Sequence, residues 1–154
     1  MDKHRFAVAA LVCALSIPVV SSREGFAAES ATQPDQRFVI ELDAPARAKV
    51  LGEMRNMLIA LREIIEALQS EDMKAVAKAA RTAGLQAPSQ ADAKIHAQVP
   101  EDFRKLGFGT HAEFDVIAAD AERYGDPKRT LRQLSGTMQK CIACHSAYQV
   151  RARR

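Results

Sequence analysis

The feature that most constrains the fold is a long stripe of apolar residues between residues 50 and 68. Its members are spaced by alternating steps of four and three, which places them on one face of an α-helix that packs in a bundle. The stripe consists of Val50, Met54, Met57, Leu61, Ile64 and Leu68, and it is widened by Leu51, Leu58 and Ile65. Asp43 is suited to cap such a helix, and Pro45 is tolerated in its first turn. These features predict a helix over residues 44–69.

Three further helices are predicted from residues that commonly start or stop helices. They cover residues 71–84, 110–124 and 126–150, and a short helical turn is expected over residues 101–107. Thr110 and Glu113 have the spacing of a capping box, and Gly125 separates the last two helices. The stretch RFVIEL, which contains Phe38, is the one segment that alternates as a strand does. Four amphipathic helices with mostly short connections predict an all-α fold, an antiparallel four-helix bundle.

The N-terminus has the pattern of a secretory signal peptide. Lys3 and Arg5 precede an unbroken apolar run from Phe6 to Val20, and small residues follow the run. This run is shorter than a comfortable membrane span, so no membrane anchor is expected. We therefore predict that the chain is exported.

Cleavage is predicted near Ala28, with Ser22 as a second position. The expected organisation is a signal peptide of residues 1–28 and a single domain of residues 29–154. Of the three cysteines, Cys13 leaves with the signal peptide, so the mature chain keeps two. An exported pair of cysteines is expected to form a disulfide unless another chemistry uses the thiols.

Charge and composition bear on the partners. The whole sequence has 22 Lys and Arg against 19 Asp and Glu, and this near balance argues against nucleic acid as the main partner. The sequence has no Trp, and 5% of its residues are aromatic. A core with so few large flat side chains leaves space for a large flat cofactor.

The two remaining cysteines stand three apart, and a histidine follows the second. On a helix Cys141, Cys144 and His145 share one face, since residues three and four apart are neighbours on a helix surface. A haem against this face could form thioether bonds with both sulfur atoms while the imidazole reaches the iron. This spacing is the signature of c-type haem attachment.

Two other chemistries are possible for the same stretch. A zinc site would need four ligands, and the sequence offers only the distant His96 and His111, which we expect to be surface or loop histidines. A redox-active pair of the thioredoxin kind is expected at a helix start in an α/β chain, whereas this pair falls late in a predicted helix of an all-α chain. Covalent haem is the interpretation that the pattern favours.

The signal peptide, the four-helix pattern and the stretch CIACHSAY together resemble the class II c-type cytochromes, the group that contains cytochrome c′ and its low-spin relatives. The resemblance extends from near Leu42 to Tyr148 and is specific at the haem site. It implies a periplasmic haem protein with one haem c, and hence one iron, per chain. Cys141 and Cys144 would attach the haem, and His145 would be the proximal ligand.

The resemblance also implies periplasmic redox proteins as partners, and a homodimer that forms through the first two helices. The sequence departs from the family at Gln149, where cytochromes c′ commonly carry an arginine. This departure bears on the comparison with the gas-binding members of the family.

The second axial position of the iron separates the candidate functions. In an up-and-down bundle the first and last helices are antiparallel, so the level of His145 corresponds to residues 50–54 of the first helix. Met54 has a thioether that can bind iron there, and Met57, one turn further away, is the second choice. A methionine on an apolar stripe is more often a flexible core residue. If Leu51 covers the iron instead, the iron is five-coordinate.

Three functions follow from these alternatives. With His145 and Met54 as ligands, the protein transfers single electrons. With an open position, it binds nitric oxide or another small gas. The third is a thiol oxidoreductase that uses the cysteines without haem; however, the sequence shows no acid/base pair, phosphate-binding loop or partnered nucleophile, and we expect no enzyme.

Overall fold

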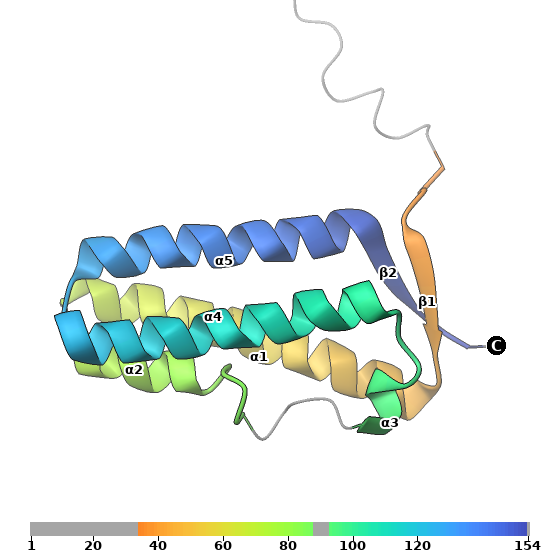
Figure 1. The fold of residues 1–154 in the computed structure, drawn as a ribbon, viewed down its shortest axis with the longest axis horizontal. Coiled ribbons are helices and arrows are strands. Elements are labelled where there is room, and N and C mark those ends of the chain that lie inside the picture. Colours follow the sequence, from red (N-terminus) through yellow and green to blue (C-terminus); the bar gives the residue numbers. More distant parts are fainter. Residues whose placement is uncertain (1–33, 88–92, 154) are drawn as a thin grey trace, which may run out of the picture. The chain divides into compact units, whose positions relative to one another are not determined.

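The computed structural model of the chain describes residues 34–87 and 93–153. The predicted signal peptide, with Cys13, lies outside these residues. The described chain is mostly helical and contains one small sheet (Figure 1). Its elements are β1 (Phe38–Leu42), α1 (Ala44–Gln69), α2 (Met73–Arg81), α3 (Ala93–His96), α4 (Glu101–Tyr124), α5 (Pro127–Ala147) and β2 (Tyr148–Ala152).

The first helix has the predicted span, and its start depends on the expected cap. The carboxylate of Asp43 accepts a hydrogen bond from the backbone N–H of Ala46 at 2.8 Å, which satisfies one of the N–H groups that a helix start leaves unpaired. The break between the last two long helices is also confirmed. Gly125 adopts the left-handed conformation with φ of 57°, and Asp126 caps α5 through the N–H groups of Lys128 and Arg129.

The prediction that a helix begins at residue 110 was wrong, because α4 begins nine residues earlier, at Glu101. Pro100 precedes the helix, and the acidic first turn complements the positive helix end. Thr110 lies in the helix interior, where its hydroxyl donates to the carbonyl of Leu106 at 2.8 Å. The Thr110–Glu113 spacing therefore reflects two residues inside one helix and not a capping box.

The second helix is shorter than the predicted span of 71–84. It begins at Met73, because the side chain of Asp72 accepts from the N–H of Ala75 at 2.9 Å and caps it. Glu71 has a positive φ of 53° and lies in the turn before the helix. The helix ends at Arg81, and Thr82 caps it.

The last helix also ends before the predicted residue 150. It stops at Ala147, and the chain continues as β2, which pairs with β1 in parallel. Phe38 is opposite Tyr148, and Leu42 is opposite Ala152. The strand-like pattern around Phe38 is confirmed as β1, and its pairing with the end of the chain was not predicted. We call the β1–β2 pair the clip.

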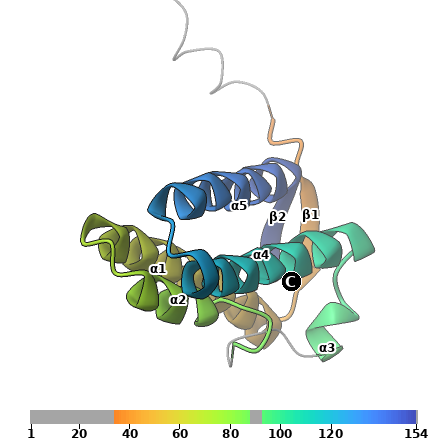
Figure 2. The ribbon, with the colours of Figure 1, turned by 60° about the vertical axis from the view of Figure 1, so that its left-hand side comes forward.

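The long helices pack in sequence, with α2 against both α1 and α4, and α5 against α4 (Figures 1 and 2). Two clusters of buried residues result. The first, which we call the helical core, consists of Ala60, Ile64, Ala67, Val76, Ala77, Ala79, Ala80, Ala83, Phe114, Ile117, Ala118, Ala121 and Leu134. The second, which we call the clip core, consists of Ile40, Leu42, Ala46, Val50, Ile95 and Val99.

Polar side chains contribute to the buried face of α5. Its buried residues are Thr130, Leu134 and Thr137, whereas Met138 and Ile142 are exposed. The two threonines can be buried because their hydroxyls donate to the carbonyls one turn earlier, at 3.4 and 3.0 Å. Of the helices in the described ranges, none is long and apolar enough to cross a membrane.

Candidate functional site

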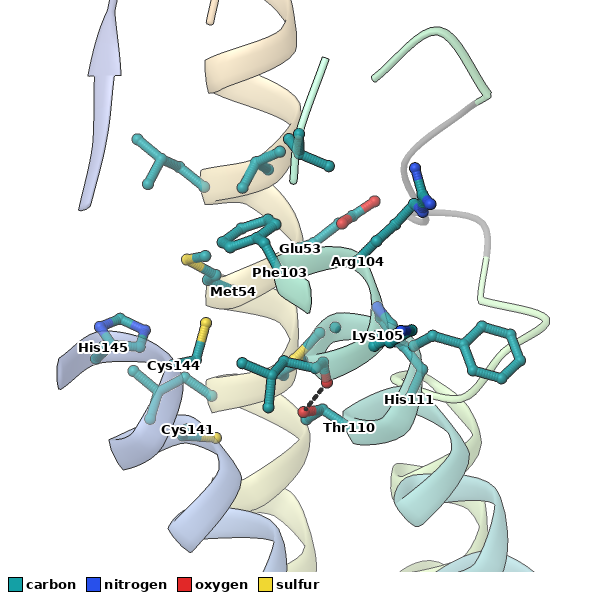
Figure 3. A pocket seen from close by; sticks show the side chains of 18 of the residues that line it. Glu53, Met54, Phe103, Arg104, Lys105, Thr110, His111, Cys141, Cys144 and His145 are labelled. Atoms are coloured by element: carbon teal, nitrogen blue, oxygen red, sulfur yellow. Dashed lines mark hydrogen bonds between the residues drawn. The ribbon is translucent and has the colours of Figure 1, made fainter. Parts of the chain in front are cut away.

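A cavity of about 1010 Å³ lies between α1, α4 and α5 (Figure 3). Cavities of about 300–1,000 Å³ are those that hold organic ligands and cofactors in proteins. Apolar side chains form much of its wall. They are Val50, Leu51, Met54, Met57, Leu58, Leu61, Ile95, Val99, Phe103, Leu106, Phe108, Met138 and Ile142.

The α5 wall of this cavity contains the three residues of the cysteine-histidine stretch. Cys141, Cys144 and His145 all line it, as their helical spacing predicts. Both thiols are free and half-buried. Burial raises the pKa of each thiol, and the neighbouring Cys141 adds to the effect at Cys144. A thiol with a raised pKa is a poor nucleophile, so this environment does not suit thiol–disulfide exchange.

The facing wall, formed by α1, carries the two candidate methionines. Met54 and Met57 both line the cavity. In Figure 3, Met54 lies below Phe103 and above Cys144 and His145. Met54 also packs against the clip core, whereas Met57 packs against the helical core. The structure therefore brings the five candidate residues of the sequence analysis to one cavity, with Met54 at the end nearer the clip.

The residues near the start of α1 differ in whether they line the cavity. Leu51 and Arg55 line the cavity, whereas Arg47 is not among its lining residues. Among the described residues, none is a hydrogen-bond partner of the buried Nε of Arg47. His96 is exposed at the end of α3, as expected of a surface histidine, and it also lines the cavity.

The expectation that His111 is a surface or loop histidine was wrong. It lies inside α4, is 7% exposed and lines the cavity. Its Nδ1 is 2.7 Å from the carbonyl oxygen of Ala83. Since a carbonyl only accepts, Nδ1 carries the hydrogen and donates it. The residue was misassigned because α4 is longer than predicted.

Glu53 is a cavity residue that sequence reasoning missed. It is 9% exposed, and its Oε1 has no hydrogen-bond partner in the described chain. Burial raises the pKa of this carboxyl from an ordinary 4.5 to about 7, against the opposing effect of the nearby Lys49. Ala46, Val50 and Glu53 are spaced by four and three residues, and all three lie on the buried face of α1. This spacing could have indicated from the sequence that Glu53 is buried.

Basic side chains of α4 complete the wall. Arg104 and Lys105 line the cavity together with Arg55 of α1. Arg104 donates to the carbonyl of His96 at 3.2 Å, which holds it near α3. Lys105 pairs with Glu101 at 2.8 Å. The cavity thus combines an apolar interior with positive charges at its α4 side.

Among the described residues, no three or more His, Cys, Asp or Glu side chains are grouped in a way that could hold a bare metal ion. Comparison with known proteins gives no relative, since the chain matches no family model, no curated protein and no solved structure. The function is therefore inferred from the residues of the cavity.

Proposed function

We propose that this chain is a periplasmic c-type cytochrome that transfers single electrons through one covalently attached haem c. In this proposal α1, α2, α4 and α5 form an antiparallel four-helix bundle around the haem. The observation that carries the proposal is that Cys141, Cys144 and His145 of α5 line the same cavity as Met54 of α1. The signal peptide that the sequence predicts supports the periplasmic location.

The residues of the cavity fit this group. The volume suits a large flat cofactor, and two free thiols lie on one wall, one helical turn apart. Apolar side chains on α1 and α4 suit the macrocycle. Arg55, Arg104 and Lys105 provide positive charges that can pair with its carboxylates.

Each residue has a distinct role. Cys141 and Cys144 hold the cofactor covalently, and His145 and Met54 are its axial ligands. The haem iron supplies the one-electron couple, and methionine/histidine ligation raises its reduction potential.

The alternative is a five-coordinate haem protein that binds nitric oxide or another small gas. Its support is that Leu51, which cannot bind iron, also lines the α1 wall. The raised pKa values of both thiols argue against the third function, a thiol oxidoreductase.

The test of covalent attachment is the mass of the protein purified from a host that exports it and attaches haem. We expect the mature chain to be heavier by one haem, and the additional mass to remain after denaturation and extraction with acidic acetone. Loss of the mass under these conditions would contradict covalent attachment. A chain without haem would contradict the proposed function.

A further inference from the structure

The clip joins the two helices that carry the candidate axial ligands. β1 ends at Leu42, and α1 begins two residues later at Ala44. β2 begins at Tyr148, directly after the end of α5. Pairing of β1 with β2 therefore ties the start of α1 to the end of α5 (Figure 1).

Little else connects these two helices directly. Contact between α1 and α5 is slight, and the cavity lies between them. They run in opposite directions, so Met54 near the start of α1 and His145 near the end of α5 lie toward the end of the unit that holds the clip (Figure 1). The distance across the cavity at these two residues consequently depends on the clip.

Hydrogen bonds connect the clip to the turn that carries His145. The guanidinium of Arg37 donates to the backbone carbonyl of His145 at 3.3 Å, and the side-chain amide of Gln149 donates to the carbonyl of Arg37 at 3.2 Å. The last carbonyls of a helix lack partners within the helix, and a cation near them is favourable. Arg37 thus supplies a partner to His145 that α5 itself cannot provide.

Aromatic packing connects the clip to the cavity wall. The ring of Tyr148 meets Phe38 of β1 edge-on at 6.1 Å and Phe103 of α4 edge-on at 5.5 Å. Phe103 lines the cavity, and it packs with Met54 against the clip core. The same small cluster therefore contacts both ligand-bearing sides of the cavity.

We propose that the clip is a positioning device, in which Arg37 and Phe38 hold the last turn of α5 and the first turns of α1 at a constant separation across the cavity. This inference rests on the proposed function, because the separation matters as the span between His145 and Met54. A constant span keeps both ligands in place when the iron changes oxidation state. Arg37 and Phe38 act through other residues and do not touch the cavity themselves.

The test compares five variants of the exported protein. Arg37→Ala and Phe38→Ala weaken the clip, and Arg37→Lys keeps a cation at the same place. Arg153→Ala is the matched control, because Arg153 also bonds a backbone carbonyl across the clip, that of Glu41 at 3.2 Å, but does not touch His145. Ile117→Val in the helical core controls for a general loss of stability.

Two kinds of measurement are made on each protein. The first is hydrogen exchange of the backbone amides from Cys144 to Tyr148. The second concerns the haem and gives its reduction potential and its low-spin fraction. Arg37→Ala is expected to speed exchange of these amides about fivefold, since it removes one hydrogen bond to a charged donor. It is also expected to shift the potential and lower the low-spin fraction. Arg37→Lys should restore part of both, and the two controls should leave both unchanged.

Unchanged exchange and potential in Arg37→Ala and Phe38→Ala, in a protein that carries haem, would overturn this inference and leave the proposed function standing. An equal change in Arg153→Ala or Ile117→Val would also overturn it, because the effect would then be a general loss of stability. A protein without haem would overturn the proposed function, and the role in ligand spacing with it.

Discussion

The two ends of this unit fill the space between their helices in different ways. In the helical core, alanines bring α1, α2 and α4 close together, and Phe114, Ile64 and Ile117 fill what remains, so that these residues are fully buried. Toward the clip, α1 and α5 are separated by the cavity. Leu58 and Ile142 at this cavity are 67% and 65% exposed. Side chains thus fill one end, whereas the other end contains the cavity in which we propose that the haem lies.

Removal of the proposed haem should have the largest effect, and this effect should be confined to the cavity end. Replacement of both Cys141 and Cys144 by Ala should abolish the proposed attachment, and an apolar cavity of this size would then lose its contents. We expect a loss of several kcal/mol and a fall in Tm of more than about 10 °C. Calorimetry measures the loss, and hydrogen exchange locates it.

Amides of α2 near Val76 should remain protected in this double variant, because the helical core does not depend on the group. An equal loss of protection in α2 and at the cavity end would contradict the claim that the helical core is stable without the haem.

The converse variant is Phe114→Ala, which empties part of the helical core. Phe114 is 0% exposed, so its truncation is expected to cost about 3–5 kcal/mol of stability to urea. The spectrum of the folded protein should not change, because Phe114 does not line the cavity. A changed spectrum at low urea would show that the two regions are coupled.

A smaller effect is expected from Glu53→Gln at the cavity wall, and its sign depends on pH. The pKa of Glu53 is raised by burial to about 7 in the folded chain, against 4.5 ordinarily. Between these values the folded chain retains a proton that the unfolded chain releases, so the stability that Glu53 contributes is present below pH 4.5 and is lost as pH rises to about 7. Glu53→Gln cannot lose stability in this way. Its free energy of unfolding, relative to that of wild type, should therefore rise by about 2–3 kcal/mol between pH 4 and pH 8.

Urea unfolding at a series of pH values measures this difference. Glu66→Gln is the control, since Glu66 lies on the exposed face of the same helix. A Glu53→Gln variant that follows wild type at every pH would contradict a buried, unpaired carboxyl at this site.

Local signals in the sequence account for α1 and for the α5 wall of the cavity. The apolar stripe and the Asp43 cap are sufficient for α1, since both act within one helix. The spacing of Cys141, Cys144 and His145 determines their common face in the same way. The antiparallel course of the helices then indicates that Met54 lies at the level of His145.

Features that depend on tertiary packing could not be predicted from local sequence signals. The burial of Glu53 and His111 depends on the register of α1 and the length of α4, and a capping-box spacing inside α4 gave the wrong start. The clip pairs residues near Phe38 with residues near Tyr148, and parallel pairing over so long a separation leaves no local signal beyond the alternation of β1. Each of these features lies at the cavity end, where the spacing of apolar residues does not determine which side chains are buried or which segments pair.

The absorption spectrum of the oxidised protein, recorded for wild type, Met54→Leu and Met57→Leu, tests the central claim most directly. We expect wild type to be low spin with the weak far-red band of methionine-to-iron charge transfer. Met57→Leu should keep that band and change stability by less than about 1.5 kcal/mol. Met54→Leu should lose the band, become high spin and bind carbon monoxide. A wild-type protein that is already high spin and binds gas freely, or a band that persists in Met54→Leu, would contradict His145 and Met54 as the pair of ligands.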